Sequence, residues 1–386
     1  MSSYTNLNAL MENYAKNSLA GCSCALTKGE EIVYENYAGF ADIEKGIPFG
    51  PDTVCRLFSM TKVIMCTAAM MLFERGKFLL NDPLSEYFPE YASPIVVKKA
   101  PDGREYVEKA QKPLLVKHAF SMACGLPYAN PESVTGRAML KVQKELREKY
   151  GRYDLQTEIK AMSQVPIAFE PGTHFLYGYG HELVAGLIEK VSGKSVGQFL
   201  KEEIFEPLGM KDTAYRFFGD ISSRMAVVYT KTPEGKLVPN EEQFTDMHAP
   251  DNPYEAGGAG LFSTLRDYTA FSRMLACGGT YKGQKIIGRR TIDLMRTNQM
   301  NEDQLRDFHN PYLDGYGYGL GVRVMMSPAE GNSNTPVGEF GWTGMLGTWA
   351  SICPEEKFSA IYMHQMMPNE EVYHHLRIRA AAYGTL

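Results

Sequence analysis

The stretch CRLFSMTK, residues 55–62, places Ser59 three residues before Lys62, and an apolar run from Val63 to Phe73 follows it. The run is typical of a buried helix that begins near Ser59 and ends shortly before Gly76. Residues three apart on a helix have Cβ atoms about 5–6 Å apart, so the two side chains can interact. The pair is therefore a candidate for chemistry.

A serine hydroxyl is a weak nucleophile until a base takes its proton. Lys62 can be that base if burial keeps its amine neutral, well below the reference pKa of about 10.4. The alternative is a structural one, with Ser59 as a helix N-cap and Lys62 exposed. A Ser-x-x-Lys match also arises by chance in a chain of 386 residues, so the pair alone does not decide between these interpretations.

A second candidate lies in PGTHFLYGY, residues 171–179, where a turn rich in glycine and proline presents Tyr177 just before a helical pattern. A tyrosine at such a place can relay a proton between a serine, a lysine and a leaving group. The alternative is a tyrosine that packs at the entry of the helix.

The third candidate is GWTGM, residues 341–345, at the start of the C-terminal pair of predicted strands. Small residues at a strand edge let a substrate carbonyl approach the backbone. An amide N–H here, together with that of Ser59, could form an oxyanion hole. The alternative is a bulge or a tight strand end.

Taken in order, these motifs resemble the Ser-x-x-Lys serine hydrolases, which are the β-lactamase and penicillin-binding protein superfamily. Within it the chain is most similar to class C β-lactamases, DD-peptidases and family VIII esterases. The resemblance runs from about Leu7 to the final predicted helix. The matching stretches are residues 55–62, 125–127, 169–177, 191–193, 207–210, 256–264, 317–321 and 341–345.

The resemblance implies roles for individual residues. Ser59 matches the family nucleophile, Lys62 its partner base, and Tyr177 the tyrosine of the Tyr-x-Asn motif. The backbone amides of Ser59 and Met345 would form the oxyanion hole. The neighbouring positions Tyr179, Trp342, Thr343 and Gly344 would contact the substrate. Which of Lys62 and Tyr177 is the main base stays open at this point.

The chain also departs from the family pattern. Position 179 is Tyr instead of Asn, so the amide that binds a peptide or β-lactam carbonyl is absent. Position 342 is Trp instead of Lys, so the cation that would receive a carboxylate is missing. We therefore expect ester or neutral amide substrates rather than penicillins. Arg323, on a neighbouring predicted strand, could supply a cation instead; the alternative is a solvated or salt-bridged surface arginine.

The pattern of predicted elements indicates the domain arrangement. A helix is expected over about 5–18 and a hairpin from Cys22 to Phe40, and the end returns to strands at 318–325, 348–353 and 358–364 before a last helix. The middle is mostly helical. We predict an α/β (α+β) fold of the β-lactamase/transpeptidase type. An antiparallel sheet flanked by helices forms from residues 1–78 and 301–386, and a mainly helical domain from 79–300, with the active site at the junction.

Composition excludes several other classes of function. Lys and Arg total 40 against 45 Asp and Glu, a net charge of −5, which gives no electrostatic reason to expect nucleic acid or an anionic membrane as partner. No signal peptide or membrane span is expected. Seven scattered cysteines without a CxxC predict reduced thiols and a cytoplasmic protein. No metal-ligand spacing is present, so neither a metal nor another cofactor is expected.

One motif points to a different hydrolase fold. GKSVG, residues 193–197, matches the G-x-S-x-G nucleophile elbow, but a helical pattern precedes it where that motif needs a strand. Ser195 with Gln198 is more typical of a helix cap.

Three functions follow from the sequence. The first is an esterase or acyltransferase that forms an acyl-enzyme on Ser59 with a small ester substrate. The second is a D-peptidase, amidase or weak β-lactamase. The third is a non-catalytic binding or assembly protein on the same fold. The natural acyl group and the oligomeric state are not encoded in these motifs.

Overall fold

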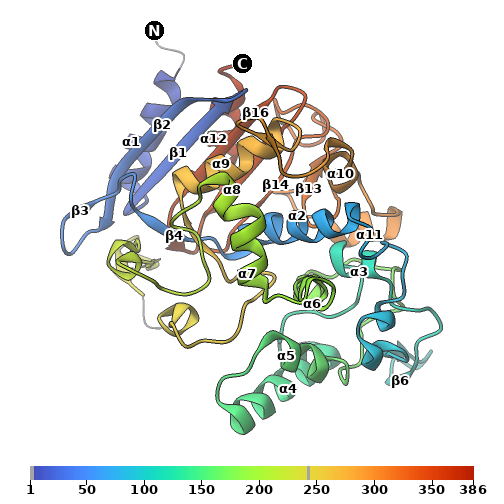
Figure 1. Cartoon of the computed structure of the whole chain (residues 1–386). Coiled ribbons are helices and arrows are strands. Elements are labelled where there is room, and N and C mark those ends of the chain that lie inside the picture. The colour runs from blue at the N-terminus through green and yellow to red at the C-terminus, as the bar shows by residue number, and fades with distance from the viewer. Residues whose placement is uncertain (1–3, 241–243) are drawn as a thin grey trace.

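An antiparallel sheet of eight strands forms the centre of the computed structural model, which describes residues 4–240 and 244–386. Its strand order is β12-β13-β14-β15-β16-β1-β2-β3. Strands β1 and β2 come from the start of the chain and β12 to β16 from its end, and β1 pairs with β16 so that Ser23 lies opposite Met363 (Figure 1). The prediction that both chain ends meet in one sheet is confirmed.

The strands of this sheet are short, except in the N-terminal hairpin. Their bounds are β1 Gly21–Lys28, β2 Glu31–Asp42, β3 Ile47–Pro48, β12 Tyr316–Tyr318, β13 Arg323–Met325, β14 Phe340–Thr343, β15 Trp349–Cys353 and β16 Phe358–Met363. Smaller pairings are formed by β4 Val54–Arg56 with β9 Phe262–Thr264, β5 Ile95–Lys99 with β6 Glu105–Lys109, β10 Thr280–Tyr281 with β11 Gln284–Lys285, and β17 Met366–Met367 with β7 Tyr229–Lys231 and β8 Leu237–Pro239.

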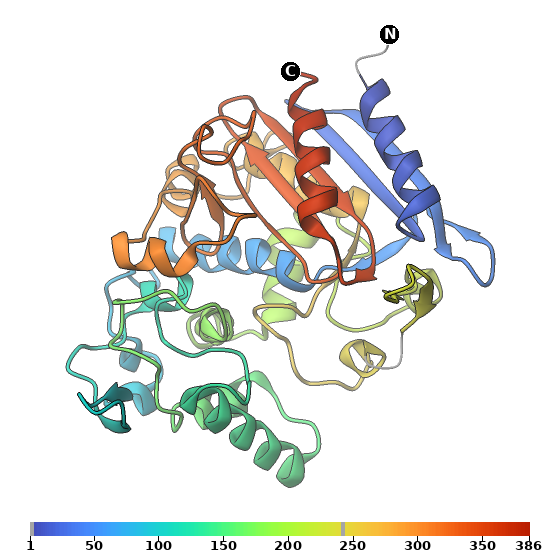
Figure 2. The same ribbon diagram turned by 180° about the vertical axis from the view of Figure 1, so that it is seen from behind.

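Helices cover both faces of the sheet. The terminal helices α1 and α12 lie side by side on one face (Figure 2), and α2 and α9 lie on the other (Figure 1). The α-helices are α1 Thr5–Asn17, α2 Thr61–Glu74, α3 Val116–Phe120, α4 Val134–Tyr150, α5 Leu155–Met162, α6 Gly180–Ser192, α7 Val196–Leu200, α8 Glu206–Leu208, α9 Leu265–Ala276, α10 Arg289–Met295, α11 Glu302–Phe308 and α12 Glu371–Tyr383. A π-helical turn, η4 Lys201–Phe205, connects α7 to α8.

Helix α2 is buried along almost its whole length, from Thr61 to Leu72. It packs against α6 of the helical region on one side and against α10 and β14 on others, so it runs through the main core of the molecule. This explains why its sequence is apolar all round rather than along a single stripe. The helix places its N-terminal end, with Ser59 just before it, between the sheet and the helical region.

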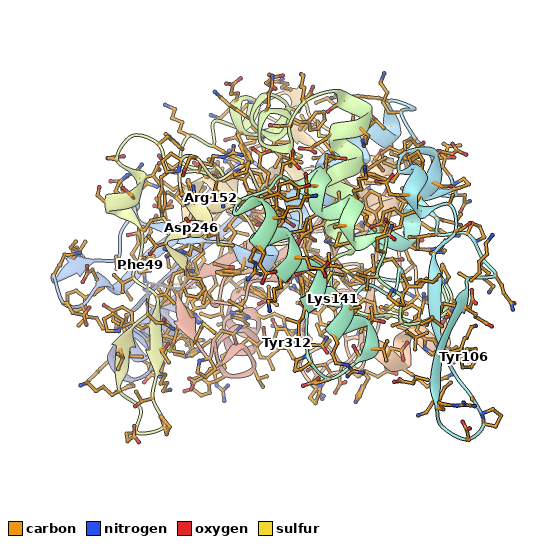
Figure 3. The ribbon with its side chains drawn as sticks, turned by 90° about the horizontal axis from the view of Figure 1, so that it is seen from below. Phe49, Tyr106, Lys141, Arg152, Asp246 and Tyr312 are labelled. Atoms are coloured by element: carbon orange, nitrogen blue, oxygen red, sulfur yellow. The ribbon has the colours of Figure 1, made fainter. Side chains whose placement is uncertain are left out.

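The helical region lies below the sheet in Figure 1 and contains α3 to α6. Figure 3 views it from below, with Lys141 on α4 and Tyr106 on the β5–β6 hairpin. Arg152, just after α4, forms ion pairs with Asp246 and Asp251, and these pairs join this region to the loop near residue 250. The pairs are exposed, so their contribution to stability is small.

The expected helices and hairpins agree with the structure, with one correction. A single strand over residues 318–325 is wrong: β12 ends at Tyr318 and β13 begins at Arg323, and the two pair as a hairpin. Gly321 lies between them with φ of +85°, a left-handed conformation that reverses the chain. The alternating pattern extended across this turn because residues on both sides of it are buried.

The boundary between the chain ends and the middle segment stays a prediction. Within that scheme, α9 of the middle segment packs against β1, β15 and β16, so the cover of the sheet includes a helix from the middle of the chain. In the part of the chain that the structure describes, no helix has the length and apolar character needed to cross a membrane.

Candidate active site

Ser59 lies at the junction of β4 and α2, where the backbone is held from both sides. Strand β4 pairs with β9, and the Leu57 N–H donates to the carbonyl of Leu261 at 2.9 Å. Phe58 then adopts φ of +44°, a costly left-handed conformation for a bulky residue. Its ring packs edge-on against Phe244, with centroids 5.6 Å apart. This constrained bend sets the direction in which Ser59 leaves the strand.

Lys62 is fully buried, and its ammonium group has three acceptors. Lys62 Nζ lies 3.0 Å from Ser59 Oγ, 3.1 Å from the hydroxyl of Tyr128 and 2.6 Å from the carbonyl of Gly258. An ammonium has three protons to donate, and three acceptors satisfy all of them. The geometry therefore suits the charged form of the lysine.

The electrostatics of Lys62 agree with that count. Burial lowers the pKa of Lys62, but the phenol oxygens of Tyr128 and Tyr177 and the carboxylate of Glu182 raise it by more, so the pKa lies above its usual range. The burial of Lys62 agrees with the sequence, but its contacts favour the charged amine over the neutral one that a base requires, and which of Lys62 and Tyr177 is the base stays a prediction. The two neighbours that oppose burial most, Tyr128 and Tyr177, come from distant parts of the chain.

Tyr177 also lies next to the lysine. Lys62 Nζ is 4.7 Å from the centre of the Tyr177 ring, a distance at which a cation is attracted to the ring face. The indole Nε1 of Trp342 donates to the Tyr177 hydroxyl at 3.0 Å, and the two rings stack with centroids 5.6 Å apart. The tryptophan that stands in the family's lysine position thus supplies a neutral hydrogen bond to Tyr177.

The turn after β14 is pressed against the segment that carries Ser59. A Cβ atom on Gly344 would lie 2.3 Å from the carbonyl oxygen of Leu57, so only glycine fits there. The Gly344 N–H donates to the carbonyl of Thr348 at 2.7 Å. Among the described residues, the next amide, that of Met345, has no hydrogen-bond partner, and neither has the amide of Ser59. Both N–H groups of the predicted oxyanion hole are therefore available.

The remaining predicted contact residues differ in what their side chains do. Tyr179 is half-buried and its hydroxyl accepts a hydrogen bond from Gln143. Trp342 is buried, with 6% of its surface exposed. The hydroxyl of Thr343 lies 3.2 Å from a carboxylate oxygen of Glu371. The predicted side chains therefore line the region around Tyr177 with aromatic rings, and a carboxylate lies beside Thr343.

Arg323 does not supply a cation to this site. Its side chain is 2% exposed and pairs with buried Glu339 at 3.2 Å and with the carbonyl of Ala350 at 2.9 Å. The alternative of a substrate-binding arginine is wrong, because its charge is already neutralised inside the sheet. His174, three residues before Tyr177, is half-exposed, and its Nδ1 lies 2.9 Å from a carboxylate oxygen of Asp307.

The sequence reasoning missed two groups that contact Lys62, the hydroxyl of Tyr128 and the carbonyl of Gly258. Tyr128 follows the Gly-Leu-Pro stretch at 125–127, and Gly258 lies in the stretch 256–264. Both stretches were part of the resemblance, so the sequence could have marked them as near the site. Their contact with Lys62 could not be predicted, because only the fold brings these segments together.

Ser195 is a helix cap, as expected. Its hydroxyl accepts from the N–H of Gln198 at 3.2 Å at the start of α7, and Gly193 ends α6 in a left-handed conformation. The nucleophile-elbow interpretation lacks the strand that it needs. In the described ranges, no group of three or more His, Cys, Asp or Glu side chains is arranged to hold a metal ion.

A profile of the family described as Beta-lactamase matches residues 7–384. The chain belongs to the beta-lactamase family. It is 25% identical to Esterase EstB of Burkholderia gladioli over 85% of this chain and 81% of that one. The solved structure of EstCE1, a hydrolase with promiscuous acyltransferase activity, superposes with a TM-score of 0.81 at 20% identity, covering 99% and 98% of the two chains. Simvastatin synthase (LovD) from Aspergillus terreus, unliganded selenomethionyl derivative, gives 0.83 at 20% identity, covering 98% and 97%.

Membership in the beta-lactamase family confirms the resemblance and the fold that the sequence predicted. The expected enzyme class, a serine hydrolase of the esterase and acyltransferase kind, agrees with what these relatives are named. The assignment of individual catalytic residues stays a prediction, now with distances attached to it.

Proposed function

We propose that this beta-lactamase-family protein forms an acyl-enzyme on Ser59 and transfers the acyl group of small, neutral esters to water or to another alcohol. One observation carries the choice of esters: the indole of Trp342, not a cation, donates to the Tyr177 hydroxyl at 3.0 Å. A site without that cation gives a substrate carboxylate no charged partner, and burying an unpaired carboxylate is costly. The names of the esterase and acyltransferase relatives support the same choice.

The contacts around Ser59 suggest how the roles divide. Lys62 is charged, with its three protons donated to Ser59 Oγ, Tyr128 and Gly258, so we assign the role of base to Tyr177. The phenolic oxygen of Tyr177 takes the proton of Ser59 as Oγ attacks the ester carbonyl. The amides of Ser59 and Met345 receive the oxyanion.

Release of the leaving alcohol completes acylation, and deacylation follows with the same proton transfers in reverse. Tyr177 gives its proton to the leaving alcohol, and the acyl group stays on Ser59. A water molecule or an acceptor alcohol then loses a proton to Tyr177 and attacks the acyl carbonyl. Tyr177 gives that proton to Ser59 Oγ as the bond between the acyl carbon and Oγ breaks.

A cytoplasmic location stays a prediction, supported by seven free cysteines, six of them buried.

Hydrolysis of p-nitrophenyl butyrate by the wild type and by Ser59→Ala tests the proposal. We expect the wild type to turn over and the variant to fall by about 10³-fold or more, to background, because the nucleophile is removed. Equal activity in both would exclude Ser59. Stable acylation by a penicillin without ester turnover would favour the peptidase or β-lactamase function instead.

A further inference from the structure

Glu182, in the first turn of α6, is a buried carboxylate that the proposed mechanism does not use. Its side chain is 3% exposed, and Oε1 accepts the N–H of Gly258 at 3.2 Å. Among the described residues, Oε2 has no hydrogen-bond partner. Buried polar groups are almost always paired, so this carboxylate calls for an explanation.

Gly258 separates Glu182 from Lys62 and contacts both. Its N–H donates to Glu182, and its carbonyl accepts from Lys62 at 2.6 Å. A Cβ atom on Gly258 would lie 3.1 Å from Lys62 Nζ and 3.3 Å from each oxygen of Glu182. The ammonium and the carboxylate therefore face each other across a gap that a single methyl group would fill.

Among the described residues that face Glu182, Lys62 is the only one with the opposite charge. Burial raises the pKa of Glu182 to about 7, Lys62 opposes that rise, and Glu158 on α5 adds to it. The remaining groups are neutral near that pH, because burial raises their pKa values above the usual range. They are Cys124 and Tyr128 from the segment after α3, Tyr179 before α6, and Tyr215 and Tyr254 from later loops.

We propose that Glu182 is a positioning residue for Lys62: the ionised carboxylate of Glu182 holds the Lys62 ammonium and the Gly258 peptide in place. The reactivity of Ser59 therefore depends on the ionisation of Glu182. This inference rests on the proposed function of Ser59. When Glu182 is protonated, the ammonium loses the carboxylate charge that faces it across Gly258, and its hold on Ser59 Oγ weakens. A carboxylate that served packing alone would have no such link to the reaction.

The test is the pH dependence of the Ser59 reaction, followed as kcat/KM for p-nitrophenyl butyrate and as the rate of labelling by a fluorophosphonate. Between about pH 6 and 8, we expect the wild-type rate to rise about tenfold through an inflection near 7, and Glu182→Gln to stay near the wild type's low-pH rate throughout. Glu158→Gln is the matched control, since Glu158 is 2% exposed but bonded to Gln143 and Tyr254. It should keep the inflection, moved somewhat below pH 7 because the Glu158 charge that raises the pKa of Glu182 is gone.

A purely structural role would lower the Glu182→Gln rate equally at every pH and leave the inflection in place, and that result overturns the inference. If Glu182→Gln does not fold, Gly258→Ala decides: the added methyl group should displace Lys62 from Glu182 and weaken or move the inflection, and an unchanged profile also overturns it. Wild type that reacts with neither reagent would refute the proposed function itself, which separates the two failures.

Discussion

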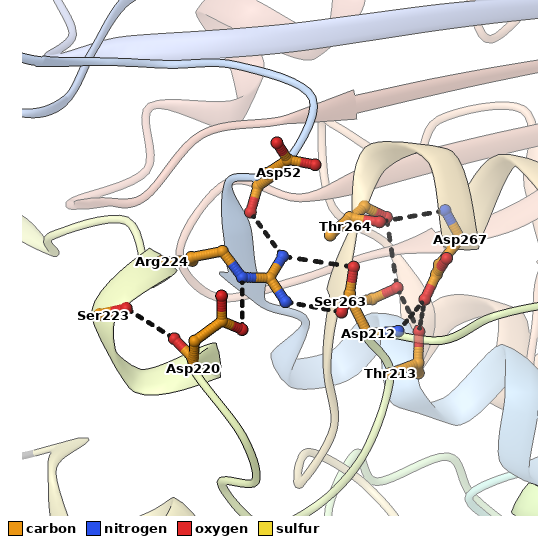
Figure 4. A network of polar contacts seen from close by, with 9 residues as sticks. All are labelled: Asp52, Asp212, Thr213, Asp220, Ser223, Arg224, Ser263, Thr264 and Asp267. Carbon is orange, nitrogen blue, oxygen red and sulfur yellow. Dashed lines mark hydrogen bonds and ion pairs between the residues drawn. The ribbon is translucent and has the colours of Figure 1, made fainter.

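Glu182 and Asp267 are both buried acids in the first turn of a helix, but their surroundings differ. Asp267 on α9, 8% exposed, accepts the N–H of Asp212 at 2.7 Å and the hydroxyl of Thr213 at 2.9 Å (Figure 4). Nearby, Arg224 pairs with Asp212 and Asp220 in the same network. Within residues 4–240 and 244–386, one oxygen of Glu182 has no hydrogen-bond partner, and the carboxylate faces the Lys62 ammonium instead.

The contrast distinguishes a polar network that stabilises the fold, around Asp267, from one that positions reactive groups, around Lys62. In the network of Asp267, each carboxylate is matched by donors, and the loop at 212–224 is fixed to β9 and α9. Around Lys62, the ammonium has a full set of acceptors, whereas the Glu182 carboxylate has fewer donors than it can accept. We expect substitutions in the first region to change stability and those in the second to change reactivity.

The largest effect is expected at Tyr177. Tyr177→Phe removes the proposed base while the ring and its stacking on Trp342 remain, so kcat/KM for p-nitrophenyl butyrate should fall by about 10²–10⁴-fold. The free energy of unfolding should fall by only about 1–3 kcal/mol, because the Trp342 N–H loses its acceptor. Tyr87→Phe is the control, since its hydroxyl bonds to Asp82 away from this site. A Tyr177→Phe enzyme that keeps most of its activity would return the role of base to Lys62.

A smaller loss of activity is expected at Tyr128. Tyr128→Phe removes one of the three acceptors of the Lys62 ammonium, and a hydrogen bond to a charged group contributes about 1.5–3 kcal/mol. We expect kcat/KM to fall about tenfold, with ester binding little changed. Steady-state kinetics measure both quantities, and a rise in KM alone would show that Tyr128 contacts substrate instead.

Asp267→Asn should change the pH dependence of stability and leave kcat/KM as it is. Burial raises the pKa of Asp267 to about 6, above its unfolded value near 3.9, so the folded protein binds the proton more tightly. Wild type therefore loses stability as pH rises from about 4 to 6, by on the order of 1–2 kcal/mol, and the Asn variant lacks this loss. Urea unfolding at pH 4.5 and 7 would show it, and parallel curves for the two proteins would contradict it.

The smallest effect is expected at Ser195. Ser195→Ala removes the cap of α7 and should lower the free energy of unfolding by about 1 kcal/mol. Ester turnover should be unchanged. A loss of turnover in a folded variant would reopen the nucleophile-elbow interpretation of residues 193–197.

Local patterns were sufficient for much of the fold. The apolar run after Ser59 predicted α2, and alternation with turn residues predicted the β1–β2 and β15–β16 hairpins, because these depend on neighbours in sequence. The strand at 318–325 failed where Gly321 turns the chain between two buried segments. Burial on both sides of a turn gives one continuous apolar pattern.

The candidate site was predictable only in part. Ser59 and Lys62 share one helical turn, so their spacing revealed them. Tyr128, Glu182 and Gly258 reach Lys62 from segments that only the tertiary fold brings together. The charge of Lys62 could not be read from its apolar surroundings, since it depends on acceptors that those distant segments supply.

The pairing of β1 with β16 has a consequence for how the protein is made. Ser23 can pair with Met363 only after all the residues between them have been synthesised. Contacts between such distant residues close slowly, and the nascent N-terminal hairpin must wait with one edge unpaired. Helix α2 packs in the core that this sheet completes, so its packing is also incomplete until β16 has paired. A chain that ends before β16 would carry Ser59 and Lys62 but lack the strand that pairs with β1, so we expect it to have no assembled site.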